Sequence, residues 1–145
     1  MRHLPTVARY LLGLVFFVFG LNGFLNFIPA PTSIPPAAGA FAGALMASHY
    51  FFPLLKGTEV ISGALLLSNR YVPLALTFLA PIVVNIFAFH AFLEPAGLPL
   101  AIFVIALEIF LAWSYRDAFK SMLAAKVSPA TSPETSSKAV ERAHA

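Results

Sequence analysis

Four apolar stretches, separated by short polar or proline-containing segments, dominate the chain up to about residue 120. They cover residues 6–28, 53–68, 72–93 and 99–119. A helix that crosses a bilayer requires about 20 mostly apolar residues to span ~30 Å of hydrocarbon. The pattern therefore predicts an all-α fold in which residues 1–120 form a bundle of four transmembrane helices.

The segment between the first two stretches has two parts. Residues 29–40 are rich in proline, which lacks an N–H donor and clashes in a helix interior, so they predict a loop. Residues 41–52 are apolar and alanine-rich but short, and predict an interfacial or re-entrant helical segment. Because residues 53–68 span only ~24 Å at ~1.5 Å per residue, we expect this preceding segment to complete the crossing.

The remaining connections are short, and the chain ends in a polar tail. Residues 69–71 and 94–97 predict tight turns, and Pro81 predicts a kink in the third helix. From residue 127 onward, Ser, Thr, Pro and Ala dominate, with scattered charges. This composition predicts that residues 121–145 form a disordered cytoplasmic tail.

The first apolar stretch also has some features of a secretory signal. Arg2 and Arg9 resemble a basic leader, and residues 38–40 (Ala-Gly-Ala) resemble a cleavage site. However, the apolar run is longer than the about 7–15 residues of a signal core. We therefore favour an uncleaved transmembrane helix.

Composition agrees with a membrane location. Of the 145 residues, 59% are hydrophobic and only 10% are charged, whereas soluble domains carry about 25% charged residues. The small net charge of +3 gives no reason to expect a nucleic-acid partner. The chain contains no cysteine, which excludes disulfides, thiolate metal sites and thiol redox chemistry.

The basic residues predict the orientation. They lie before the first helix, between the second and third, and after the fourth: Arg2, Arg9, Arg70, Arg116, Lys120 and Lys126. The other two connections contain no lysine or arginine. By the positive-inside rule, we expect both termini in the cytoplasm and the protein in the cytoplasmic (inner) membrane.

Polar residues within the apolar stretches are the candidates for a functional site, because an ionisable group in hydrocarbon is costly unless it is paired or faces a cavity. The predicted intramembrane polar site consists of Asn22, Asn26, Lys56, Glu59, Asn85 and Glu108. Most of them lie ~12–21 Å from the cytoplasmic helix ends at ~1.5 Å per residue, so we expect one shared polar centre.

Structural explanations remain open for these residues. The asparagines can join helices by hydrogen bonds, and Lys56 and Glu59 can neutralise each other at positions i and i+3. Glu108 has no partner of opposite charge on its own helix, so it must be protonated, paired across helices or hydrated. It is therefore the strongest functional candidate.

A second group is expected at the outer mouth of the bundle: His49, His90 and Glu94. His90 lies ~140° around the helix from Asn85 at ~100° per residue, so we do not expect both to face the bundle centre. His90 and Glu94 are four residues apart, which suits a hydrogen-bonded pair better than a metal site with only two ligands. We predict no metal.

The order of these features resembles the DoxX-like family of integral membrane proteins. The matching segments are LLGLVFFVFGLNGF (11–24), ALMASHYFFPLLKGTEVISGALLL (44–67), RYVPLALTFLAPIVVNIFAFHAFLEPAGLP (70–99) and ALEIFLAWSYRDAF (106–119). The resemblance implies a four-helix bundle in the cytoplasmic membrane. The positions that match are Asn22, Glu59, Gly63, Pro81, Asn85, His90 and Glu108.

The family name derives from a subunit of a quinone-linked oxidoreductase for sulfur compounds, and other members are associated with resistance to oxidative stress. The resemblance thus implies an accessory or quinone-interacting component of a membrane redox system, rather than a stand-alone enzyme. Quinone is the candidate cofactor, and the candidate partners are the lipid bilayer, other redox subunits and a second copy of the chain. The alternatives are a small proton-linked transporter or channel that uses Glu59 and Glu108, and a structural or assembly protein.

Overall fold

The computed structural model describes residues 3–29, 31 and 33–129, and this part of the chain is helical without any β-strand. The helices are α1 (Leu4–Leu25), α2 (Pro36–Ala47), α3 (Phe51–Leu67), α4 (Val72–Phe92), the 3-10 helix η1 (Pro95–Gly97), α5 (Leu98–Ser114) and α6 (Arg116–Phe119). The all-α prediction is thereby confirmed.

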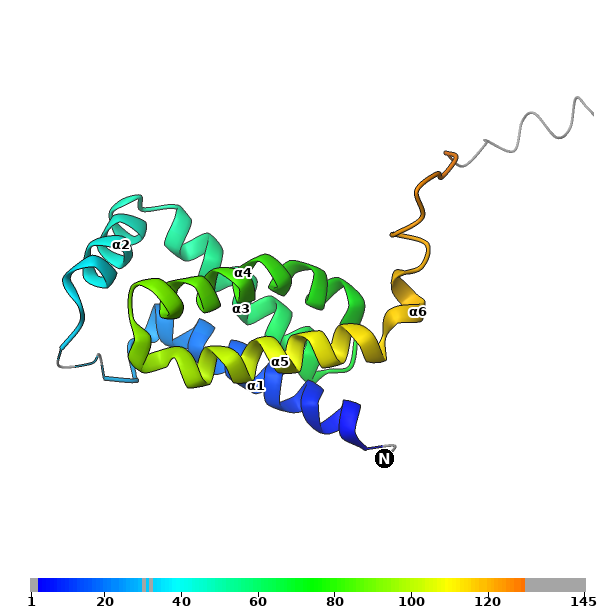
Figure 1. The fold of residues 1–145 in the computed structure, drawn as a ribbon, viewed down its shortest axis with the longest axis horizontal. Helices are drawn as coiled ribbons and strands as arrows, with labels where there is room; N and C mark the ends of the chain where they lie inside the picture. Colours follow the sequence, from blue (N-terminus) through cyan, green and yellow to red (C-terminus); the bar gives the residue numbers. More distant parts are fainter. Residues whose placement is uncertain (1–2, 30, 32, 130–145) are drawn as a thin grey trace, which may run out of the picture.

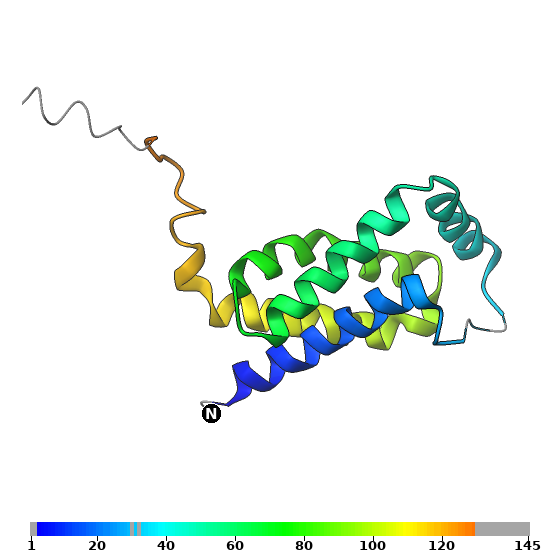
Figure 2. The ribbon, with the colours of Figure 1, turned by 180° about the vertical axis from the view of Figure 1, so that it is seen from behind.

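The four long helices lie side by side and run in alternating directions (Figure 1). Helix α1 contacts α3 and α5, and α4 contacts the same two helices from the opposite side. The start of α1, the turn between α3 and α4, and the end of α5 lie at one end of the bundle, whereas α2 and η1 lie at the other (Figures 1 and 2). The start of α1 and helix α6 therefore lie at the same end of the bundle (Figures 1 and 2).

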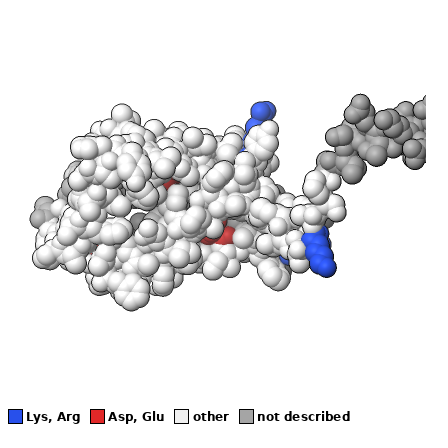
Figure 3. All heavy atoms as spheres, turned by 90° about the horizontal axis from the view of Figure 1, so that it is seen from above, with Lys and Arg blue, Asp and Glu red and all other residues white. Residues whose placement is uncertain are grey.

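Three helical segments are long and apolar enough to cross a membrane: α1, α4, and residues Pro95–Ser114, which join η1 to α5. The pair α2 and α3 also meets this criterion, but the two helices are bent by 92°. Large apolar side chains cover the outside of the bundle, and the face in Figure 3 is almost entirely uncharged. The described part of the chain thus has three to four candidate membrane spans.

Close packing of α1 on α3 is made possible by glycines on both helices. A Cβ atom on Gly63 would lie 2.6 Å from the backbone nitrogen of Phe17 and 2.9 Å from the carbonyl oxygen of Gly13. Small residues allow helix backbones to approach in this way, which strengthens van der Waals packing. Around this contact, the core is formed by fully buried apolar side chains such as Leu12, Phe16, Leu66, Leu79 and Leu111.

Helix α2 includes residues 36–40, which the sequence predicts to belong to a loop over residues 29–40. It begins at Pro36, because proline is tolerated in the first turn, where its missing N–H has no helical partner. The loop prediction is therefore wrong for residues 36–40. Helices α2 and α3 are bent by 92°, as in a broken span or a re-entrant loop, so the expected completion of that crossing stays a prediction.

The ends of two other helices also differ from the predicted boundaries. Helix α1 stops at Leu25, where Asn26 adopts the left-handed conformation with φ of 50°. Helix α5 stops at Ser114 rather than at residue 119, and a break at Tyr115 separates it from α6.

Helix α4 runs without interruption through Pro81. Residues 121–129 are exposed, and the rest of the predicted tail lies outside the described residues.

Candidate functional site

A cavity of about 490 Å³ lies between the helices, in the half of the bundle that carries α2. Side chains from α1, α2, α3, α4 and α5 line it, and most are apolar. Six of them are phenylalanines: Phe16, Phe19, Phe41, Phe51, Phe52 and Phe89. We refer to this space, with its polar residues Lys56, Glu59, Asn85 and His90, as the central cavity.

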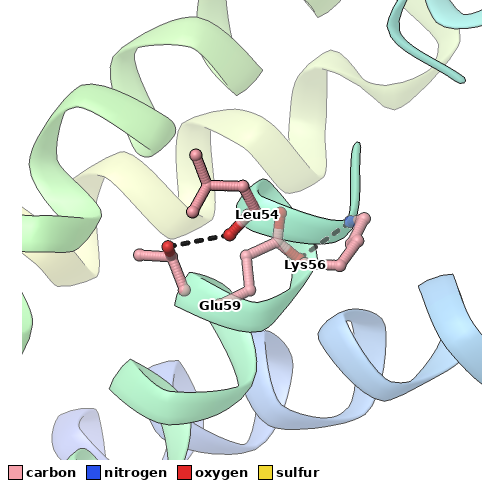
Figure 4. Close-up of polar contacts among 4 residues, drawn as sticks. Leu54, Lys56 and Glu59 are labelled. Carbon is pink, nitrogen blue, oxygen red and sulfur yellow. Dashed lines mark hydrogen bonds and ion pairs between the residues drawn. The ribbon is translucent and has the colours of Figure 1, made fainter. Parts of the chain in front are cut away.

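Lys56 and Glu59 form an ion pair at the wall of the central cavity. Their Nζ and Oε2 atoms are 2.8 Å apart (Figure 4). One helical turn brings positions i and i+3 to the same face, which is why α3 presents both groups together. The carboxylate is more deeply placed than its partner, since Glu59 is only 3% exposed. The pair predicted from the spacing is thus present.

Glycines of α1 make room for this pair. A Cβ atom on Gly20 would lie 3.1 Å from the Cβ of Glu59, and one on Gly23 would overlap the aliphatic stem of Lys56. Larger side chains at these positions would push α3 away from α1. The glycines therefore help to hold Lys56 and Glu59 against the cavity.

Asn85 and His90 both line the central cavity from α4, although their angular separation predicted otherwise. The cavity contacts several other residues of α4 between and before them, including Pro81, Ile86 and Phe89. The Nδ1 atom of His90 lies 2.8 Å from Oε2 of Glu94. Oε2 of Glu94 also accepts a hydrogen bond from the backbone N–H of Gly97, at 3.2 Å.

This arrangement fixes the imidazole at one end of the cavity. The contact from Glu94 engages Nδ1, and Phe89 packs edge-on against the ring, with centroids 5.2 Å apart. Phe89 in turn contacts Phe41 of α2 at 5.7 Å. The predicted His90–Glu94 pair is therefore present, and aromatic contacts connect it to the helix that covers the cavity.

Three predicted site residues lie away from the central cavity. The Oδ1 atom of Asn22 accepts a hydrogen bond from the backbone N–H of Ile28 at 2.6 Å, which organises the chain after α1. Asn26 is exposed and terminates that helix. His49 is exposed in the connection between α2 and α3, with φ of 60°, and does not line the cavity.

Glu108 also lies apart from the other polar residues. It lines a second space of about 420 Å³ between α4 and α5, and the two spaces share no lining residue. Its side chain is 6% exposed, and Oε2 has no hydrogen-bond partner. The single polar centre expected from depth alone is thus divided between two faces, because depth along a helix does not specify direction around it.

The chemistry of the central cavity is that of a site for a largely apolar molecule with hydrogen-bonding groups. It offers an ammonium, a carboxylate, an amide and an imidazole within aromatic walls. No sequence pattern singles out its phenylalanines, since phenylalanine is frequent throughout the chain, with 15 occurrences. Within the described ranges, no group of three or more His, Cys, Asp or Glu side chains is arranged to hold a metal ion.

Comparisons of the chain with models of protein families, with curated proteins and with solved structures found no match.

Proposed function

We propose that this membrane protein binds a quinone in the central cavity and serves as an accessory component of a membrane redox system. The single observation that carries the proposal is the cavity itself. Its volume of about 490 Å³ and its apolar, aromatic lining with few polar groups are typical of small-molecule sites. A planar quinone ring fits between aromatic side chains, and its two carbonyl oxygens require hydrogen-bond donors.

The polar residues of the cavity supply such donors. The amide of Asn85 and the ammonium of Lys56 each carry N–H groups that can donate to a quinone carbonyl, whereas Nδ1 of His90 is already engaged by Glu94. Glu59 is positioned next to the ammonium and offers a route for the proton that accompanies quinone reduction. The electron donor is a partner protein, in keeping with an accessory role rather than a stand-alone enzyme.

We further propose that the chain is a DoxX-like four-span bundle of the cytoplasmic membrane. In this arrangement, α3 and the bent α2 form one broken span, and both chain ends lie in the cytoplasm. The start of α1 and helix α6 lie at one end of the bundle, which supports this arrangement (Figures 1 and 2). Basic residues outside the long helices lie at the same end: Arg70, Arg116 and Lys120.

Quinone binding is tested with purified protein in nanodiscs and short-chain ubiquinone and menaquinone analogues, by calorimetry. We expect saturable binding that Asn85→Leu weakens about tenfold, corresponding to the about 1–1.5 kcal/mol of a lost hydrogen bond. Glu108→Gln is the matched control, because it changes a polar residue that lies outside the cavity. Absence of saturable binding, or equal weakening by both variants, contradicts the proposal.

A proton-linked transporter is the second candidate function, favoured by the buried Lys56–Glu59 pair at a cavity wall. A joint site with Glu108 is disfavoured because that residue lines a different space. If the protein is a proton-linked transporter, we expect proteoliposomes to show a proton flux. We expect Glu59→Gln to abolish this flux and Glu108→Gln to preserve it. A purely structural role predicts neither quinone binding nor flux.

A further inference from the structure

The second space, between α4 and α5, contains a buried carboxyl group that the proposed quinone site does not use. Apart from Glu108 and Thr77, its walls are apolar, with side chains such as Leu76, Val84, Ile105 and Ile109. We call it the Glu108 groove. Its volume of about 420 Å³ is that of a small-molecule site.

The polar atoms of the groove lack donors. Glu108 is only 6% exposed, yet its Oε2 atom has no hydrogen-bond partner among the described residues. The hydroxyl of Thr77 donates to the carbonyl oxygen of Pro73 at 2.9 Å, so its oxygen remains free only to accept.

Among the residues that the structure describes, no cation neutralises this carboxyl group. Lysine, arginine and histidine are absent from the groove lining. Arg9 and Lys56 are bonded elsewhere within the bundle. The other described lysines and arginines lie outside the long helices: Arg70, Arg116, Lys120 and Lys126. Among the described residues, the long helices of a second copy therefore offer no unpaired lysine or arginine to Glu108.

We propose that the Glu108 groove binds a lipophilic primary amine, with the ammonium on Glu108 and the alkyl body along the apolar walls of α4 and α5. An ammonium supplies three N–H donors and a positive charge to a site whose free polar atoms are acceptors. An alkyl chain matches walls formed by leucine, isoleucine and valine. The occupant is thus a different chemical class from the quinone proposed for the central cavity.

The test uses full-length protein in phosphatidylcholine nanodiscs and a dodecylamine that carries a diazirine on its alkyl chain. After irradiation, peptide mapping is expected to place the label on the segments that line the groove, residues 76–84, 105–112 and 119–122. Unlabelled dodecylamine is expected to compete with the probe, whereas dodecanol and dodecanoate compete at least tenfold more weakly. Glu108→Gln is expected to reduce labelling at least tenfold, whereas Asp117→Asn, at an exposed carboxylate, is labelled as strongly as the wild type.

Glu108→Asp keeps the carboxyl group and is expected to retain part of the labelling, which separates loss of charge from loss of fold. The positions of the label on the wild-type protein test the proposed location of the amine even if a variant unfolds. Equal competition by dodecanol, labelling confined to other helices, or unchanged labelling of Glu108→Gln overturns the proposal. So does cross-linking that finds the groove covered by a second copy from which the amine is excluded.

Discussion

The guanidinium of Arg9, near the start of α1, donates hydrogen bonds to the carbonyl oxygens of Leu66 and, at 3.3 Å, Leu67 at the end of α3. The last four carbonyl groups of a helix have no intrahelical partners, and at a buried end they must be satisfied by other groups. Arg9 is only 4% exposed, and its guanidinium also stacks on Tyr10, 4.4 Å from the ring centroid. Arg9 is one of the basic residues that predict the orientation, and it also connects α1 to α3.

Replacing Arg9 by leucine is expected to destabilise the bundle, because the carbonyl groups at the end of α3 lose a charged donor. The expected cost is about 1–3 kcal/mol of unfolding free energy. Unfolding in mixed micelles, followed by circular dichroism, measures it. Arg70→Gln is the control, because Arg70 is exposed in the turn between α3 and α4. Equal stability of the two variants would show that the buried contact contributes little.

Gly63→Val is expected to separate α1 from α3. The added side chain meets the backbone of Phe17 and Gly13, which cannot move aside like the tip of a flexible side chain. We expect a loss of about 1–3 kcal/mol or more, as for other overpacked sites. Gly39→Val is the matched control, because a Cβ at Gly39 meets no atom within 4 Å. Similar thermal stability of both variants would contradict close glycine packing.

The Lys56–Glu59 pair predicts a non-additive double-mutant cycle. Lys56→Met leaves the carboxylate of Glu59 buried without its partner and is expected to cost about 3–5 kcal/mol of stability. Adding Glu59→Gln removes the unpaired charge and is expected to restore most of that loss. Unfolding of the wild type, both single variants and the double variant gives the coupling energy. A coupling energy near zero would mean that the two side chains are independently solvated.

The proposed orientation predicts the accessibility of single cysteines, and the natural chain provides a cysteine-free background. Asn69→Cys in the α3–α4 turn and Ser121→Cys after α6 are expected to react from the cytoplasm only. Ser33→Cys, before α2, is expected to react with a membrane-impermeant maleimide added outside intact cells. Labelling of all three positions from the same side would refute the four-span arrangement.

Much of the helical architecture follows from local sequence. Runs of apolar residues identify α1, α4 and the segment Pro95–Ser114 as membrane-length helices, because backbone hydrogen bonds in a helix form between near neighbours. The same short range explains why the pairs Lys56–Glu59 and His90–Glu94 follow from spacings of three and four residues. The helical start at Pro36 was missed because proline both begins and breaks helices, and the bend that follows depends on packing.

The arrangement of the site depends on contacts between distant residues. Sequence alone placed Glu59, Asn85 and Glu108 at similar depth, but the tertiary structure separates Glu108 into its own groove and brings Asn85 and His90 to one cavity. Sequence likewise could not assign Arg9 to carbonyl groups of α3, 57 positions from Leu66. The apolar helices and their local ion pairs follow from the sequence, since they depend on neighbours along the chain. Which helix faces meet depends instead on how side chains from all helices pack together, and is therefore visible only in the folded bundle.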